Sequence, residues 1–168
     1  CTPVASVPAA VVAQPAPRPP IIEVHGHIGA NAYDEALKLA DENGIQRIVN
    51  LSGGNQSSSK GLDQHLAAMK RHPGRLAVFF NVPWRYHDDP RFGLLVPGAL
   101  EQAVQAGYAG LKVPKALGLG VPDANGGFLA VDDPSLDPIW AKAGELGVPV
   151  SIHTGDPKAF FDPVTPQN

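Results

Sequence analysis

Three histidines of the sequence follow two short apolar runs, and their types and spacing suit metal binding. His25 and His27 stand two positions apart in the run Ile-Ile-Glu-Val-His-Gly-His. Residues i and i+2 of an extended chain point to the same side, so both imidazoles can converge on one point. His153 follows a second apolar run, residues 148–152. Because neutral imidazole is the commonest metal ligand and suits zinc, iron or nickel, we predict a three-histidine metal site with an open position for water.

Candidate substrate-binding side chains follow two further apolar runs. Lys112 stands near the end of one run, where its cation could bind a substrate carboxylate as a point charge. Trp84, Arg85 and Tyr86 follow the other, and two aromatic rings beside an arginine suit an aromatic or carboxylated substrate. The alternatives are a structural role for Lys112 and a loop that packs on its own aromatic side chains. We therefore predict Lys112, Trp84 and Arg85 as substrate contacts.

The elements that must position these residues alternate along the chain. Runs of β-branched residues predict strands, and apolar residues three and four apart predict helices. We expect strands at residues 21–25, 45–50, 76–82, 109–113 and 148–152, and helices at residues 33–42, 62–71, 98–106 and 136–146. Such alternation implies right-handed crossovers and a parallel sheet. In parallel α/β folds, function gathers at the carboxyl ends of the strands, where all three histidines are expected.

Two architectures fit this order: an open doubly wound sheet, or part of a (β/α)8 barrel. Length favours the open sheet, since a barrel needs eight strands and about 250 residues. The polar residues at the strand ends favour the barrel. His65 and His72 fall on or beside the second helix, away from the strand ends, and we interpret them as surface residues.

Composition excludes several classes of protein. The 168 residues carry a formal net charge of −3, which argues against a nucleic-acid-binding surface. No run approaches the ~18 apolar residues of a membrane span. The single cysteine, Cys1, excludes an internal disulfide and a cysteine-based zinc cluster. The 18 glycines and 18 prolines indicate many turns.

Residues 1–20 form a segment apart from the domain of residues 21–168. They contain many prolines and alanines, no acidic residue and one basic residue, so we expect an extended, polyproline-like spacer. Cys1 before that spacer is similar to the acylated first residue of a mature bacterial lipoprotein. This resemblance implies a lipid anchor on the bacterial cell envelope, facing the periplasm or the exterior.

The histidine motifs carry a second resemblance. His25-Gly26-His27, Gly110-Leu111-Lys112 and residues 147–156, Gly-Val-Pro-Val-Ser-Ile-His-Thr-Gly-Asp, resemble the amidohydrolase superfamily, and within it the amidohydrolase 2 group of TIM-barrel hydrolases and decarboxylases. The resemblance implies a distorted (β/α)8 barrel with a divalent metal, usually zinc, at its mouth. It implies that His25, His27 and His153 are metal ligands. Relatives also differ in the lysine at the fourth strand, which is carboxylated and bridges two metals in some and contacts substrate in others.

The sequence departs from the family pattern in two places. Glu23 stands where the family often has aspartate. The aspartate that ends the eighth strand in the family, and acts there as general base, has no counterpart within residues 1–168. We therefore expect the N-terminal part of a (β/α)8 barrel, about five βα units, belonging to a longer enzyme. Asp156, the nearest carboxylate in sequence, is expected to brace the loop after the fifth strand.

Three functions remain open from the sequence. The first is a metal-dependent hydrolase, in which metal-activated water attacks a C–N or C–O bond of a small substrate. The second is a non-oxidative decarboxylase on the same scaffold. The third is a non-catalytic lipoprotein module that binds metal or ligand. The sequence leaves the oligomeric state open, a homo-oligomer included, and its only predicted membrane contact is the lipid on Cys1.

Overall fold

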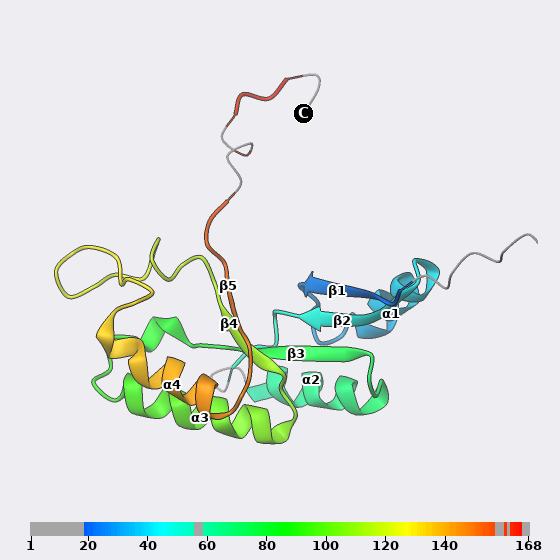
Figure 1. Ribbon diagram of the computed structural model, residues 1–168, viewed down its shortest axis with the longest axis horizontal. Helices are drawn as coiled ribbons and strands as arrows, with labels where there is room; N and C mark the ends of the chain where they lie inside the picture. The colour runs from blue at the N-terminus through cyan, green and yellow to red at the C-terminus, as the bar shows by residue number, and fades with distance from the viewer. Residues whose placement is uncertain (1–18, 56–58, 157–159, 161, 166–168) are drawn as a thin grey trace, which may run out of the picture.

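The computed structural model describes residues 19–55, 59–156, 160 and 162–165 of the chain (Figure 1). Among the elements whose bounds the structure describes, five strands alternate with four α-helices and two short 3-10 helices. The elements are β1 (Ile21–Gly26), α1 (Tyr33–Glu42), β2 (Ile45–Asn50), α2 (Ser59–Arg71), β3 (Leu76–Asn81), η2 (Trp84–Tyr86), α3 (Phe92–Ala106), β4 (Gly110–Val113), η3 (Pro134–Leu136), α4 (Asp137–Glu145) and β5 (Val150–Ile152).

The strands form one parallel sheet in the order β1-β2-β3-β4-β5. A doubly wound sheet reverses its strand order at a switch point, and this sheet has no reversal. The sheet curls, with α2, α3 and α4 running along one side of it (Figure 1). The fold is therefore the N-terminal part of a (β/α)8 barrel, as predicted.

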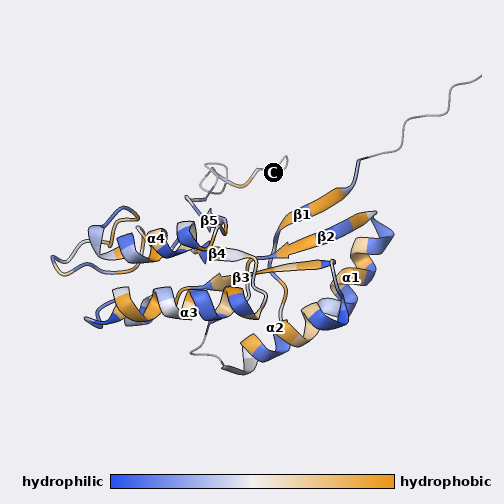
Figure 2. Cartoon of the chain, turned by 60° about the horizontal axis from the view of Figure 1, so that its bottom comes forward, coloured by the Kyte–Doolittle hydropathy of each residue, from blue (hydrophilic) through white to orange (hydrophobic). Residues whose placement is uncertain are grey.

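Burial differs sharply between the middle and the edges of the sheet. All four residues of β4 are buried, and so are most of β3, including Val78 and Phe80. In β1, by contrast, Ile22 and Val24 are 49% and 66% exposed, and in β5 Ile152 is 43% exposed. Apolar residues of the strands and of the inward helix faces gather between the two layers (Figure 2). The core thus sits around β3 and β4, and the two edge strands are covered least.

Most elements match the sequence prediction, and the differences have local causes. The third helix begins at Phe92 and not at residue 98. Pro97, which directly precedes the predicted start, lies inside the helix. Proline gives up one backbone hydrogen bond there, and the burial of Phe92 and Val96 holds the first turns against the core. Gly107, with φ +118°, then ends the helix in the left-handed conformation that glycine favours.

The predicted N-terminal tether lies almost wholly outside the described residues, so the tether and the lipid on Cys1 stay predictions. Within the part of the chain that the structure describes, no helix is long and apolar enough to cross a membrane.

Candidate metal centre

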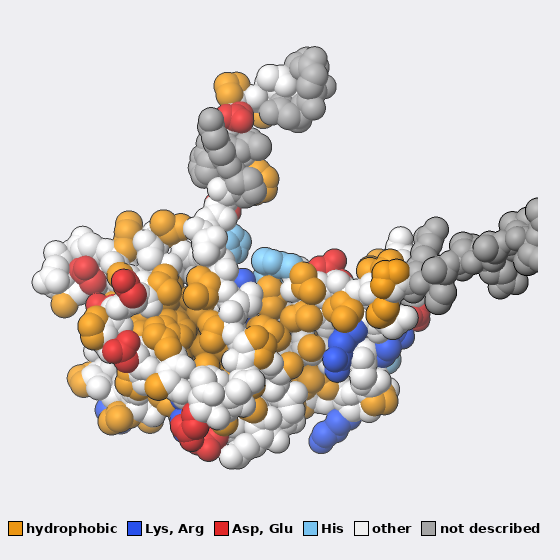
Figure 3. Space-filling view, viewed as in Figure 1, with side chains coloured by type: hydrophobic (Ala, Val, Ile, Leu, Met, Phe, Trp, Pro, Cys, Tyr) orange, Lys and Arg blue, Asp and Glu red, His pale blue; other side chains and the backbone are white. Residues whose placement is uncertain are grey.

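The structure brings the three predicted histidine ligands together. The ring centroids of His25 and His27 lie 5.1 Å apart, and those of His25 and His153 lie 6.2 Å apart. His25 and His27 stand at the end of β1 and His153 directly follows β5, so the curl of the sheet brings the histidines at the carboxyl ends of its first and last strands together. Histidine side chains gather at this carboxyl end of the sheet, between β1 and the segment that follows β5 (Figure 3).

Gly26 allows the first two histidines to approach β2 closely. A Cβ atom added at Gly26 would lie 2.9 Å from Cγ2 of Ile48 and 3.2 Å from the carbonyl oxygen of Val49. A larger residue at position 26 would push the end of β1 away from β2. Glu23 further fixes this strand end, because the backbone N–H of His25 donates to Glu23 Oε1 at 2.8 Å.

Two of the three histidine rings have the separation expected of metal ligands, and the third does not. Two imidazoles on one tetrahedral zinc, with Zn–N near ~2.0–2.1 Å, have ring centroids about 5 Å apart. The pair His25–His27 has this separation, whereas His153 lies farther out. Among the described residues, no three His, Cys, Asp or Glu side chains stand close enough around one point to hold a metal as they are placed. The three-histidine metal site therefore stays a prediction.

The electrostatics of His27 suit a neutral, metal-binding imidazole. Burial lowers the pKa of His27, and repulsion from the charges of His25, Lys112 and His153 lowers it further. A lowered pKa keeps His27 neutral at pH 7, the form that binds a metal. The same interactions place Lys112 within electrostatic reach of His27. The donor set and its charge therefore fit a divalent cation.

Lys112 is an unusual side chain at the carboxyl end of the sheet. It is 3% exposed, its Nζ atom has no hydrogen-bond partner among the described residues, and burial lowers its pKa. An ammonium group has three donors, and burying it unpaired is costly. Among the described residues, Lys112 is therefore a buried donor without an acceptor, at the same end of the sheet as the histidines.

Asn50, at the end of β2, is buried just as deeply but is fully hydrogen-bonded. Its Oδ1 accepts from the backbone N–H groups of Ile28 and Ser52, both at 3.0 Å. Its Nδ2 donates to the carbonyl of Ile28 at 2.9 Å and to the hydroxyl of Tyr33 at 2.6 Å. This side chain ties the segment after His27 to the end of β2. Sequence reasoning gave Asn50 and Ser52 no role, and their position at a strand end was the one available signal.

His65 contradicts its interpretation as a surface residue. It is 4% exposed, and its Nδ1 lies 2.6 Å from the Tyr33 hydroxyl. Because that hydroxyl accepts from Asn50, it donates its own hydrogen to His65, whose pKa is lowered by burial. The hydrogen bond to Tyr33 from α1 satisfies a polar ring that helix periodicity alone placed in solvent. His72, as predicted, lies nearer the surface and pairs with Asp34 at 2.7 Å.

The remaining predicted contacts lie apart from the histidines. Trp84 is buried against Phe92, and its Nε1 has no partner among the described residues. Arg85 is exposed, and its guanidinium lies 4.8 Å from the centre of the Tyr86 ring. No interaction joins these side chains to the histidine cluster within the described residues, so their role as substrate contacts stays a prediction.

Asp156 braces the loop after β5. One of its oxygens accepts from Lys115 Nζ at 2.7 Å, and the other lies 3.8 Å from His153 Nε2. The aspartate thus ties the loop that carries His153 to the segment after β4, as the sequence predicted.

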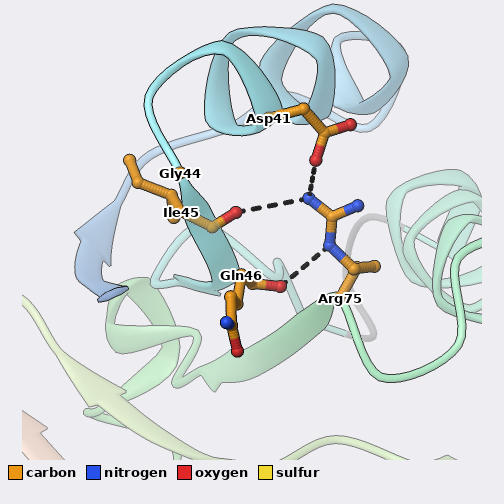
Figure 4. Close-up of a pocket in the computed structure, with 5 residues that line it drawn as sticks. All are labelled: Asp41, Gly44, Ile45, Gln46 and Arg75. Carbon is orange, nitrogen blue, oxygen red and sulfur yellow. Dashed lines mark hydrogen bonds and ion pairs between the residues drawn. The ribbon is translucent and has the colours of Figure 1, made fainter. Parts of the chain in front are cut away.

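A pocket of about 510 Å³ lies far from this chemistry (Figure 4). Its centre is Arg75, which donates to the carbonyls of Gln46 and Ile45 and to Asp41. These contacts join the start of β2 to the start of β3, at the end of the sheet opposite the histidines. On a barrel scaffold that end serves stability, and the hydrogen bonds of Arg75 serve the same purpose here.

Comparison with known proteins decides the family. The amidohydrolase sequence family of the amidohydrolase 2 type matches residues 22–167. The chain belongs to the amidohydrolase family. Comparison with curated proteins gives no match.

Two solved structures share the fold of this amidohydrolase. One is a 2,6-dihydroxybenzoate decarboxylase bound to 2,6-dihydroxybenzoate, with 18% identity, a TM-score of 0.51, and coverage of 83% of this chain and 50% of its own. The other is the 5-carboxyvanillate decarboxylase LigW2 from Novosphingobium aromaticivorans, with bound manganese and 3-methoxy-4-hydroxy-5-nitrobenzoic acid. Its identity is 14%, its TM-score 0.53, and the coverage 85% of this chain and 53% of its own. The amidohydrolase chain thus spans about half the length of these neighbours.

Proposed function

We propose that this amidohydrolase chain carries the metal-binding part of a non-oxidative decarboxylase for a small, carboxylated aromatic substrate. The observation that carries the proposal is the buried, unpaired Nζ atom of Lys112 within electrostatic reach of His27. A buried ammonium without an acceptor suits an anionic ligand, and a carboxylate is an anion that such a point charge binds. The two decarboxylases that share the fold support the same class of substrate.

In this proposal His25, His27 and His153 hold a divalent metal. A bound metal would supply positive charge that orients and polarises an oxygen of the substrate. Zinc is the metal expected from the sequence, and manganese is the metal bound in LigW2. The lowered pKa of His27 favours the neutral ring that either metal requires.

Lys112 would bind the substrate carboxylate directly. The wall around it comes from buried residues of β3 and β4, so the ion pair forms away from water, where it is stronger. In the sheet register Lys112 lies opposite Asn81 of β3 and Ser151 of β5, whereas its chain neighbour Leu111 points to the other face, into the apolar core.

Hydrolysis is the second candidate, and Asp156 is the observation that favours it. Hydrolysis needs a base for the attacking water, and Asp156 lies 3.8 Å from His153. Its ion pair with Lys115 would have to open first. The two reactions differ in their products: decarboxylation releases CO2, and hydrolysis adds the elements of water.

The test has two stages. Metal content is measured after loading with Mn²⁺ or Zn²⁺, in the unaltered protein and in the double variant His25→Ala/His27→Ala. His72→Ala, a histidine outside the cluster, is the control. We expect about one metal per chain, lost in the double variant and kept in the control. Metal retained by the double variant would overturn the proposed site.

The second stage measures products. The metal-loaded protein is incubated with 2,6-dihydroxybenzoate, 5-carboxyvanillate and related hydroxybenzoates, and CO2 and the aromatic product are quantified. We expect CO2 in equal amount to the decarboxylated product, with Lys112→Met inactive. Product that has gained water without CO2 would make the protein a hydrolase, and metal binding without turnover would make it a binding module. The envelope anchor is a separate proposal, tested by the mass of the mature chain and any lipid on Cys1.

A further inference from the structure

We infer that Ser52 is a positioning residue that holds His27 in the tautomer and orientation needed for metal binding; this inference rests on the proposed metal site. Ser52 Oγ lies 2.8 Å from His27 Nδ1. An imidazole that binds a metal through one nitrogen carries its hydrogen on the other. With Nδ1–H donated to the serine oxygen, Nε2 keeps the lone pair that a metal requires.

Both partners of this hydrogen bond are fixed by the same side chain. Asn50 accepts from the backbone N–H of Ser52, and it bonds both backbone groups of Ile28, the residue after His27. The ends of β1 and β2 are therefore held at one spacing. The segments that carry Ser52 and His27 are therefore held in place, which keeps the serine hydroxyl within hydrogen-bond distance of the imidazole.

The network continues away from the metal site into the core. Asn50 donates to the Tyr33 hydroxyl, which in turn donates to the buried His65 of α2. The support for His27 thus reaches from β1 through β2 to helices α1 and α2. Each member of the chain behind Ser52 is buried, which keeps water from replacing the hydrogen bonds.

His25 and His153 have no comparable support. Their rings have no side-chain hydrogen bond among the described residues, apart from the 3.8 Å approach of His153 to Asp156. We therefore assign His27 as the fixed ligand of the three, against which the other two rings adjust. Ser52 sets the position of that fixed ligand.

The first test reads the tautomer directly in the metal-free protein. Long-range ¹H–¹⁵N NMR of the imidazoles, with the His27 signals assigned by their loss in His27→Ala, reports which nitrogen carries the hydrogen. We expect Nδ1–H in the unaltered protein and in Ser52→Thr, and a mixture in Ser52→Ala. An unchanged His27 tautomer in Ser52→Ala would overturn the inference, whether or not the protein binds metal.

The second test measures the dissociation constant for Mn²⁺ and Zn²⁺. We expect about a 10- to 100-fold weaker affinity in Ser52→Ala, the range for loss of a partner behind a metal ligand, and recovery in Ser52→Thr. Ser151→Ala is the control, because its hydroxyl makes no hydrogen bond to another described residue. Equal affinities in Ser52→Ala and the control would contradict the positioning role. No metal binding in any form would refute the proposed function while the tautomer test still stands.

Discussion

Asn50 and Lys112 occupy equivalent places in the fold but differ in their hydrogen bonding. Each is a buried polar residue at the carboxyl end of a strand, Asn50 on β2 and Lys112 on β4. Asn50 makes four hydrogen bonds, whereas Lys112 Nζ makes none to any residue that the structure describes. Buried polar groups are normally paired, so Asn50 follows the general pattern and Lys112 departs from it. Under the proposed function, the substrate carboxylate would supply the missing partner of Lys112.

The difference teaches how to separate scaffold from site in this family member. A satisfied network stabilises the protein, and removing one partner strands the others. An unpaired buried cation, by contrast, costs stability. The two kinds of residue therefore respond to substitution with opposite signs, and that opposition can be measured.

The largest expected change in unfolding free energy is at Asn50, the fully hydrogen-bonded residue of the pair. Asn50→Ala leaves both backbone groups of Ile28 and the backbone N–H of Ser52 without the partner that Asn50 supplies, and removes one of the two hydrogen bonds of the Tyr33 hydroxyl. It should lower the free energy of unfolding by about 3–5 kcal/mol. Denaturant unfolding measures the change. Asn43→Ala, which removes one exposed hydrogen bond to Leu39, is the control and should cost less than about 1 kcal/mol. Equal losses at both positions would break the comparison.

Tyr33→Phe tests the same hydrogen-bond network more finely, because it removes only one oxygen atom from it. The hydroxyl joins Asn50 to His65, so its loss strands a donor on one side and an acceptor on the other. We expect a loss of about 1–3 kcal/mol in unfolding free energy, smaller than that of Asn50→Ala. A loss as large as that of Asn50→Ala would mean that the tyrosine, not the asparagine, is the centre of the network.

Lys112→Met should act in the opposite direction. It replaces a buried unpaired amine by an apolar chain of similar length, and should raise the unfolding free energy by about 1–2 kcal/mol at pH 7. Because the pKa of Lys112 is lowered in the folded state, the unfolded chain binds more protons below 10.5 and the stability of the unaltered protein rises toward that pH. The gap between variant and parent should therefore shrink from pH 7 to pH 10. Lys142→Met, which removes an ion pair with Glu145, should not stabilise the protein.

The smallest effect is a pH dependence at His65. Burial lowers its pKa in the folded state below the ordinary 6.5, so the unfolded chain takes up the proton first as the pH falls. Stability should therefore decrease as the pH falls through 6.5 toward the lowered value. His65→Gln keeps an acceptor for Tyr33 but cannot titrate, and should flatten this part of the curve. An identical pH profile in the variant would assign the dependence to other groups.

The sequence reveals the two sides of this comparison unequally. The strand-end positions of His25, His27 and Lys112 could be predicted because their signals are local: a two-residue spacing and a place at the end of an apolar run. The network of Asn50 could not, because its partners are remote: Ile28 is 22 positions away and Tyr33 is 17. His65 was misread for the same reason, since its partner Tyr33 is 32 positions away. Pro97 hid the start of α3, where burial outweighs the lost hydrogen bond.

The order of strands was predictable only as far as their alternation. Alternation gives a parallel sheet, but both architectures share it. The sequential order from β1 to β5 is set by packing across the sheet, and it is this order that brings β1 and β5 near each other at the histidines. The gathering of the three histidines is thus a consequence of the curl more than of any single motif.

The most direct test of the central claim is the location of the metal itself. Crystals of the protein loaded with Mn²⁺ or Zn²⁺ would be measured at the absorption edge of that metal. We predict one anomalous peak within bonding distance of His25, His27 and His153, with Lys112 facing the same space and His27 bound through Nε2. A peak held by other residues, or no peak in crystals of metal-saturated protein, would contradict the account.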